Sequence, residues 1–361
     1  MQERPGTVGT SRRREQLERV AAAYEQAAER VGRVSRRFRI AGHLVELEFA
    51  GDALVPYLTP ALEHLAVEDA GEPELRVRAF DSWSTGVRLP LTRDELVALH
   101  EGGMPAAQAV DGIHAAYQRP DSGLSFVDLA AGEAWYWSES ARTTPFWDVA
   151  GPLRGILGWF LRSKGKQFVH AGAVANPDSG RAVLLVGPSG SGKSTTSVIC
   201  HEAGMGFLAD DYCAVCVGGG AGTMVYSLFA TAKVNGDVLS RLPEASPRML
   251  NRVAFTEGRD AKAALAVRSS YRRPVVESAP VGAIVAPFVG KAGESTRAAR
   301  LSAAAALSVL APSTMLQLAS GTAVGLRDLA ALVSAIPAYR LNVNQSERSL
   351  VDEILSISGP V

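Results

Sequence analysis

The chain has 361 residues, of which 47% are hydrophobic and 20% charged, and its 37 basic and 37 acidic residues leave no net charge. This length exceeds one ordinary core and predicts two domains. Zero net charge provides no global basic field, so we expect no nucleic-acid partner. No apolar run is long enough to cross a bilayer, and no apolar core follows the N-terminal arginines. We therefore expect no stable membrane insertion, no secretory signal and a cytoplasmic protein.

Residues 1–35 form the first predicted segment, an N-terminal helix or arm. Its apolar residues recur three and four positions apart, which is the spacing of one helix face. They are Leu17, Val20, Tyr24, Ala27, Val31 and Val34. The pattern favours a helix docked on its own domain. It leaves open a coiled-coil contact, and hence a homo-oligomer, or a basic helix on a membrane surface.

Residues 36–142 are predicted to form an α+β recognition or scaffolding domain. HLVELEF (43–49) and ELRVRAF (74–80) alternate apolar and polar side chains, as half-buried strands do. LSFVDLAAGEAWYW (124–137) predicts two strands around an Ala-Gly turn. We expect no catalytic group here, because the histidines are scattered singly: His43, His64, His100 and His114.

Residues 143–361 are predicted to form an α/β domain. In 143–165 an apolar stripe predicts a helix, with Asp148 as candidate N-cap and Gly165 as the candidate residue just beyond its C-terminus. Strands then alternate with helical segments, which is typical of an α/β domain. The last predicted helices are SAAAALSVL (302–310), LRDLAALVSAI (326–336) and SLVDEILSI (349–357).

The segment RAVLLVGPSGSGKSTTSVIC (181–200) contains the strongest motif in the chain. An apolar strand precedes a complete G-x-x-x-x-G-K-[ST] sequence, and a helix-compatible stretch follows. The N–H groups of such a P-loop curl around phosphate oxygens at a helix N-terminus. We expect Lys193 to reach the β- and γ-phosphates of ATP and Ser194 to ligate Mg²⁺. The predicted nucleotide-binding residues are Gly187, Pro188, Ser189, Gly190, Ser191, Gly192, Lys193, Ser194 and Thr195.

FLADDYCAV (207–215) places two adjacent aspartates, Asp210 and Asp211, at the end of an apolar strand. They follow Lys193 by 17 and 18 residues, which leaves room for a helix, a turn and a parallel strand. The pair should lie at the carboxyl end of that strand, where ligands of open α/β sheets bind. One carboxylate could hold Mg²⁺ and the other could accept a proton from an attacking hydroxyl. A capping or turn role is the alternative.

The three cysteines offer a second motif, because Cys213 and Cys216 form a C-x-x-C sequence. A strand places residues three apart on opposite faces, and no second Cys or His pair follows at zinc spacing. We interpret these two residues and Cys200 as small core residues rather than as a metal or redox site.

Taken in order and at their spacing, KQFVHAGAVA, GPSGSGKSTT and FLADDYCAV resemble the catalytic domain of bacterial HPr serine kinase/phosphorylase. The resemblance covers residues 165–217 well and the remainder to the C-terminus loosely. The flanking sequence resembles the broader group of HPr-kinase-like proteins, which includes kinases that phosphorylate serine in ribosomally made peptides. The resemblance implies an HPr-kinase-like P-loop fold for residues 143–361.

The same resemblance implies a role for each matching residue. Lys193 becomes the phosphate lysine and Ser194 a metal ligand. Asp211 becomes the proton acceptor, with Asp210 beside it. His170 occupies the position of the family's active-site histidine, although His-Ala-Gly replaces the usual His-Gly. From the residues alone, the alternating strand FVHAGAV leaves a structural role for His170 equally open.

The chain departs from the family's pattern in two places. The family has a metal-binding glutamate downstream of the lysine, whereas this chain has LFATAKVNG (228–236) with Lys233 near that position. A lysine could neutralise phosphate charge or pair with Asp210. The family's long signature segment and capping arginine are not recognisable either. Arg268, Arg272 and Arg273 are candidates for an anion-binding loop or an exposed basic turn, and phosphorolysis stays open.

The leading hypothesis is an ATP-dependent kinase that transfers the γ-phosphate to a hydroxyl, expected to be serine of a peptide or protein. Its catalytic residues would be Lys193, His170, Asp210 and Asp211, with Ser194 and Asp210 as metal ligands and with ATP and Mg²⁺ as cofactors. The alternative is an ATP-binding regulatory or assembly protein that phosphorylates no acceptor, which the missing glutamate favours. A plain NTPase motor or transporter subunit is disfavoured, because no LSGGQ-like signature is present.

Overall fold

The computed structural model describes residues 6–99, 109–110, 112–118, 123–220, 222–235, 262–267, 275–291, 294–295, 297–317 and 322–359. It contains two compact units. The first consists mainly of Met1–Pro60 and Leu65–Ser163, and the second mainly of Lys164–Leu318 and Thr322–Val361. Among the described residues, no helix is long and apolar enough to cross a bilayer.

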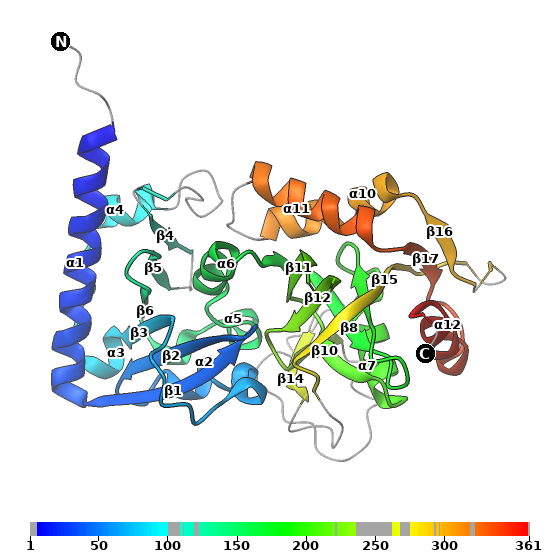
Figure 1. Ribbon diagram of the computed structural model, residues 1–361. Coiled ribbons are helices and arrows are strands. Elements are labelled where there is room, and N and C mark those ends of the chain that lie inside the picture. The colour runs from blue at the N-terminus through cyan, green and yellow to red at the C-terminus, as the bar shows by residue number, and fades with distance from the viewer. Residues whose placement is uncertain are drawn as a thin grey trace, which may run out of the picture. The chain divides into compact units, whose positions relative to one another are not determined.

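The first unit is built on a six-stranded mixed sheet with the strand order β1-β2-β3-β6-β5-β4 (Figure 1). β3 pairs parallel with β2 and with β6, and the other neighbours are antiparallel. The two alternating sequences correctly predicted β2 and β3, and the segment with the Ala-Gly turn correctly predicted β5 and β6. The strands are β1 (Arg33–Ile40), β2 (His43–Ala50), β3 (Leu75–Asp81), β4 (Ile113–Tyr117), β5 (Leu124–Asp128) and β6 (Glu133–Ser138).

Helix α1 (Gly6–Val31) packs on this sheet through the predicted apolar stripe. The stripe residues from Leu17 to Ala27 are buried in one core with side chains of the sheet, as the docked-helix interpretation expects. The last two predicted members were wrong. Val31 is 41% exposed, and Val34 lies in β1, because Gly32 takes a left-handed φ of +83° and ends the helix before it.

Residues 143–165 form two short helices instead of the single predicted one, α5 (Phe146–Ala150) and α6 (Arg154–Ser163). Asp148 lies inside α5 and accepts a hydrogen bond from Arg154, so its prediction as an N-cap was wrong. Gly165 has φ of +72°, the left-handed geometry expected just beyond a helix. Both helices belong to the first compact unit. A separately folding domain that begins at residue 143 stays a prediction.

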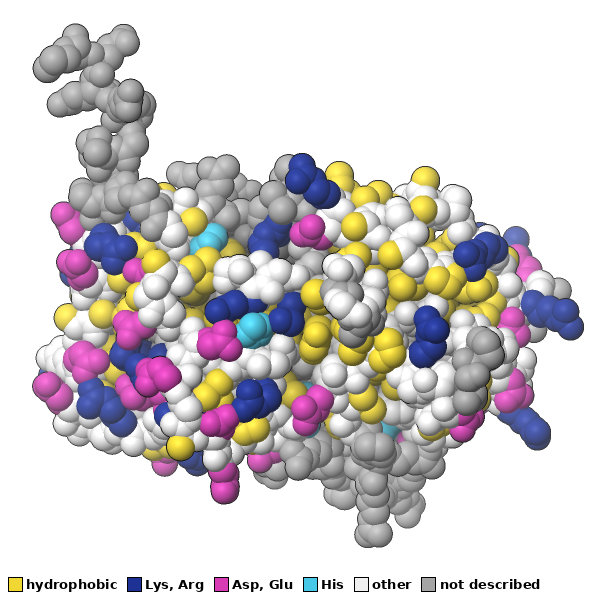
Figure 2. Space-filling view, viewed as in Figure 1, with side chains coloured by type: hydrophobic (Ala, Val, Ile, Leu, Met, Phe, Trp, Pro, Cys, Tyr) yellow, Lys and Arg dark blue, Asp and Glu magenta, His cyan; other side chains and the backbone are white. Residues whose placement is uncertain are grey.

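Short helices connect the elements of the first part of the chain. They are α2 (Val55–Leu58), α3 (Ser82–Thr85) and α4 (Arg93–Ala98), with 3₁₀ turns η1 (Pro60–Leu65) and η3 (Ala141–Thr143). Over β1 and β2, Figure 2 shows basic and acidic side chains side by side. Below this surface, the Arg37 and Arg76 guanidiniums both donate to the buried carboxylate of Glu46, at 3.1 and 2.9 Å. Opposite charges on neighbouring strands stabilise the pairing of these strands.

The second unit contains a nine-stranded sheet with the order β10-β8-β9-β15-β12-β11-β7, and β16 and β17 join it beyond β15. β9, β15 and β17 are parallel, whereas β8 runs antiparallel between β9 and β10. β10 is therefore parallel to β9, as the spacing of the motifs predicted, but β8 separates the two strands. The bounds are β7 (Gln167–Val169), β8 (Ala171–Ala175), β9 (Ala182–Val186), β10 (Gly206–Ala209), β11 (Cys213–Gly219), β12 (Gly222–Ser227), β15 (Ser278–Phe288), β16 (Ala299–Leu301) and β17 (Ala338–Asn342).

Helices cover both faces of this second sheet (Figure 1). In β9, Leu184 faces a core shared with α10 (Ala303–Gln317) and α11 (Thr322–Ala335), and Leu185 faces a core shared with α7 (Lys193–Glu202) and α12 (Glu347–Ile357). Burial on both faces explains why β9 is a continuous apolar run. The three predicted C-terminal helices and the α/β class are confirmed. A two-stranded ribbon, β13 (Thr231–Asn235) and β14 (Lys262–Ala266), completes the unit.

Candidate functional site

Two connections in the second sheet bring His170 next to Asp211. His170 is the single residue between β7 and β8, and residues 210–212 connect β10 to β11. β7 pairs with β11, and β8 pairs with β10. Each connection therefore joins a strand of the first pair to a strand of the second. The two connections lie next to each other, and the histidine and the aspartates meet at one edge of the sheet.

The P-loop lies at the same edge, because β8 is also the neighbour of β9. Gly187, Gly190 and Gly192 have φ values of +145°, +83° and +101°, which favour glycine over other residues. A Cβ at Gly192 would lie 2.9 Å from Cγ2 of Val343. Both the backbone angle and this close contact therefore require glycine at the start of α7.

Lys193 is the first residue of α7 and is buried. Its ammonium reaches back across the loop, donating to the carbonyl oxygens of Gly187 at 2.7 Å and Pro188 at 3.1 Å. The loop tip from Pro188 to Gly190 is exposed. The lysine thus lies inside the loop, and its contact with the β- and γ-phosphates stays a prediction. Thr195 follows in α7 and is half-buried.

Asp210 is almost fully buried, and one of its carboxylate oxygens is held by the protein. Oδ2 accepts a hydrogen bond from the backbone N–H of Lys233 at 2.7 Å. Burial, followed by the negative charge of Asp211, raises the pKa of Asp210 to about 6, against hydrogen bonds from this N–H and from the Ser194 hydroxyl. Oδ1 is buried and has no hydrogen-bond partner among the described residues. This oxygen is available to a ligand.

Both oxygens of Asp211 are engaged. Oδ1 is 2.7 Å from Nε2 of His170, and Oδ2 accepts from the ammonium of Lys233 at 2.7 Å. Burial alone would raise the pKa of Asp211, but the charge of Lys233 and the hydrogen bonds from His170 and Lys233 outweigh it and hold the pKa well below its ordinary value. Asp211 is therefore an ionised carboxylate with a fixed orientation.

His170 is buried and is held at its backbone and its ring. Its N–H donates to Oγ1 of Thr314 at 3.2 Å. Because ionised Asp211 can only accept, Nε2 carries the proton of their hydrogen bond. The ring lies against that of Tyr212, with centroids 5.3 Å apart. The hydrogen bond to Asp211 brings His170 into the candidate site, and its functional role stays a prediction.

Gly172 explains the glycine of the His-Ala-Gly sequence. A Cβ there would lie 2.7 Å from Oγ of Ser197 and 3.1 Å from the backbone oxygen of Asp210. The missing side chain lets β8 approach α7 and the aspartate connection closely. The sequence contains this glycine, but only the pairing of β8 with β10 gives its reason.

The sequence left two roles open for Lys233, neutralising phosphate charge or pairing with Asp210, and the ammonium does not take the second of them. Its ammonium pairs with Asp211, and it is its backbone N–H that reaches Asp210. Lys233 comes from β13, which lies outside the main sheet, so no local pattern could reveal which aspartate it meets. The candidate anion-binding residues Arg268, Arg272 and Arg273 lie outside the described residues.

Ser194 and Asp210 fit a magnesium ion. Within the described ranges, no group of three or more His, Cys, Asp or Glu side chains could hold a metal ion. Mg²⁺ does not need such a group, because it commonly takes one or two protein ligands together with phosphate oxygens and water. Oδ1 of Asp210 is buried and accepts no hydrogen bond among the described residues, and the Ser194 hydroxyl acts on the same carboxylate, so the two residues offer that kind of ligand set.

The cysteines lie in β11 and α7 rather than in the candidate site. Cys200 and Cys213 are buried, and Cys216 is half-buried. Burial raises the pKa of both Cys200 and Cys213 to about 12. Their thiols are therefore protonated and belong to the cores of the sheet.

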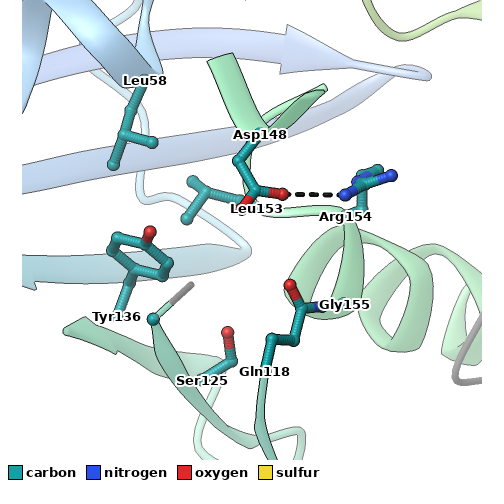
Figure 3. A pocket seen from close by; sticks show the side chains of 9 residues that line it. Leu58, Gln118, Ser125, Tyr136, Asp148, Leu153, Arg154 and Gly155 are labelled. Atoms are coloured by element: carbon teal, nitrogen blue, oxygen red, sulfur yellow. Dashed lines mark hydrogen bonds and ion pairs between the residues drawn. The ribbon is translucent and has the colours of Figure 1, made fainter. Parts of the chain in front are cut away.

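A small pocket lies in the first unit (Figure 3). It encloses about 350 Å³, part of it open to solvent, and the Arg154 guanidinium and Asp148 carboxylate on its wall lie 2.7 Å apart. These opposite charges neutralise each other, so the pocket lacks the excess positive charge that would attract phosphate. It is lined by Leu58, Gln118, Gly123, Ser125, Tyr136, Asp148, Leu153, Arg154 and Gly155.

Comparison with known proteins shows a distant structural relationship. No family model and no curated protein matches the chain. A solved structure of the HPr(Ser) kinase/phosphatase from Coxiella burnetii is similar, with 12% sequence identity and a TM-score of 0.30. The match covers 53% of this chain and 93% of that chain. Similarity at this level indicates a distant structural relationship alone.

Proposed function

We propose that the protein is an ATP-dependent kinase that transfers the γ-phosphate to a hydroxyl, that of serine in a peptide or protein. One observation carries the proposal: the P-loop, His170 and the two aspartates meet at one edge of the second sheet. A phosphate-binding loop beside an ionised carboxylate is what phosphoryl transfer to a hydroxyl requires. HPr-kinase-like chemistry on serine is the form of this proposal that the motifs favour.

The nucleotide would be held by the P-loop amides and Lys193. Ser194 and Asp210 would hold Mg²⁺, which when bound neutralises charge on the β- and γ-phosphates. Lys193 already points into the loop, so its ammonium needs only to exchange carbonyl oxygens for phosphate oxygens. The arrangement supplies positioning and charge stabilisation, the two main sources of catalysis in this reaction.

The transfer itself uses Asp211 as the proton acceptor. The hydroxyl oxygen forms a bond to the γ-phosphorus while the bond to the bridging oxygen breaks, and that electron pair leaves with ADP. The hydroxyl proton passes to the Asp211 carboxylate. Because the transition state is loose, this proton leaves late, so a weakly basic carboxylate that orients the hydroxyl suffices. His170 holds the carboxylate in place.

A second function is favoured by one observation. His170 and Lys233 already occupy both oxygens of Asp211, which would suit a protein that binds ATP for regulation or assembly and phosphorylates no acceptor. The kinase proposal requires one of these two contacts to yield to the acceptor hydroxyl.

Incubation with γ-labelled ATP, Mg²⁺ and serine-containing peptides, beside Lys193→Ala, separates the two functions. A kinase gives labelled phosphoserine that depends on Lys193. A binding protein shows ATP affinity that depends on Lys193, with no labelled acceptor. Cytoplasmic location and homo-oligomerisation stay predictions.

A further inference from the structure

Lys233 contacts both aspartates of the candidate site with different parts of the same residue. Its backbone N–H donates to Asp210 and its ammonium donates to Asp211, each at 2.7 Å. Two contacts of this kind fix the ammonium relative to both carboxylates.

The ammonium is also held by its surroundings. Lys233 is the central residue of β13 and lies opposite Ala264 of β14. The ring of Tyr212 lies against the ammonium, 5.7 Å from centroid to Nζ. The side chain is 15% exposed, so the charge is largely withdrawn from water and acts more strongly on neighbouring charges.

A short chain of contacts links Lys233 to the P-loop. Its N–H binds Asp210, and Asp210 follows β10, which β8 joins to β9, the strand that leads into the P-loop. The ammonium, which pairs with Asp211, therefore lies at the edge of the sheet that carries the P-loop. Lys193 lies within the loop itself.

We propose that Lys233 is a catalytic residue whose ammonium binds the phosphoryl group during transfer. This inference rests on the proposed kinase function. The ammonium leaves Oδ2 of Asp211 for the phosphoryl oxygens, which frees that oxygen for the acceptor hydroxyl. Lys233 gains and loses no proton, and the bonds formed and broken are those of the transfer described above. The charge then acts on the group in transit, where it lowers the barrier most.

The test measures binding of a mimic of the transition state and needs no acceptor. MgADP and MgADP with fluoroaluminate, a planar mimic of the phosphoryl group, are titrated into wild type, Lys233→Met and Lys233→Arg. We expect Lys233→Met to bind MgADP like wild type and to bind the fluoroaluminate complex about 100-fold more weakly. Lys233→Arg, which keeps the charge, should recover part of the loss. Unchanged fluoroaluminate binding in Lys233→Met would overturn the proposal.

Further variants separate the possible failures. Lys291→Met, a change of an exposed lysine, controls for loss of charge. Asp211→Asn tests whether Lys233 acts only by positioning Asp211. If Asp211→Asn and Lys233→Met lose equal affinity for the fluoroaluminate complex, a direct contact between Lys233 and the phosphoryl group is overturned. If Asp211→Asn retains that affinity, the direct contact is supported. If Lys233→Met does not fold, Lys233→Gln replaces it in the same comparison. Wild type that binds neither complex refutes the kinase proposal, whereas MgADP binding with no effect at Lys233 refutes this inference alone.

Discussion

The Nε2 atom of His170 and the Oδ1 atom of Asp211 lie 2.7 Å apart, although 41 positions of sequence separate the two residues. The hydrogen bond joins the connection between β7 and β8 to that between β10 and β11. It fixes the direction of a carboxylate that also pairs with Lys233. The candidate site therefore depends on the pairing of four strands, β7 with β11 and β8 with β10.

Lys193→Ala should weaken ATP binding or turnover by about 10²–10³-fold, because it removes the ammonium inside the P-loop. Isothermal titration with MgATP shows whether binding is lost, and initial rates show whether turnover is lost. Lys291→Ala, at an exposed lysine, is the matched control. Full ATP use by Lys193→Ala would refute the P-loop assignment.

Asp211→Asn and Asp210→Asn should have different effects. The first keeps the size of the side chain but cannot accept a proton, so phosphate transfer should fall about 10²–10⁴-fold with ATP binding nearly unchanged. The second should raise the Mg²⁺ concentration needed for half-maximal rate, because Asp210 is the proposed metal ligand. Magnesium titrations of both rate and ATP affinity give the comparison. Equal and mild effects would mean that the pair is a structural turn.

Gly172→Ala should disturb the site through backbone packing. Its Cβ would meet Oγ of Ser197, which can rotate, and the backbone oxygen of Asp210 at 3.1 Å, which has less freedom. We expect a loss of stability of about 1–3 kcal/mol and a fall in kcat larger than the change in KM. Gly155→Ala, whose Cβ would meet nothing closer than 3.8 Å, should be close to neutral in urea unfolding. Equal stability of the two variants would contradict the packing argument.

The stability of the first unit should fall in acid because of His114. Burial, followed by the charges of Arg13 and Arg162, lowers the pKa of His114 to about 4. An unfolded histidine binds its proton near pH 6.5, so the unfolded state takes up the proton first as the pH falls. The contribution of neutral His114 to the free energy of unfolding is complete above about pH 6.5. It is lost as the pH falls to about 4, with a slope of at most about 1.4 kcal/mol per pH unit.

Urea unfolding between pH 7 and pH 4 measures this slope. His114→Phe keeps a ring to stack on Trp159, whose ring centroid lies 4.9 Å from that of His114, but it cannot titrate. The variant should therefore have a flatter dependence on pH than wild type. Identical slopes would show that other groups cause the acid sensitivity.

Two fragments test where the nucleotide-binding domain begins. The sequence predicted a start at residue 143, whereas α5 and α6 belong to the first compact unit and α6 contacts β5 there. We expect a fragment of residues 164–361 to be more soluble than one of residues 143–361, because it omits α6, whose apolar side chains are buried in the first unit. Both should bind ATP. Binding by neither, with both folded by circular dichroism, would show that the first unit completes the nucleotide site.

Local patterns in the sequence determined much of this protein. A strand buried on both faces must be apolar, so the apolar run of residues 182–186 predicted β9. A P-loop requires its glycines for its own backbone conformation, whatever surrounds it. The spacing from Lys193 to Asp210 also predicted that β10 runs parallel to β9. These features depend on contacts within a few residues or on the length of one helix.

Tertiary structure alone decided the partners across the site. Strand pairing between distant segments decides three features of the site. It inserts β8 between β9 and β10, it brings the ammonium of Lys233 to Asp211, and it leaves no room for a side chain at Gly172. The helix end at Gly32 and the break between α5 and α6 were missed for a related reason. Apolar spacing marks a buried face, but it does not mark where the chain must turn to reach its next partner.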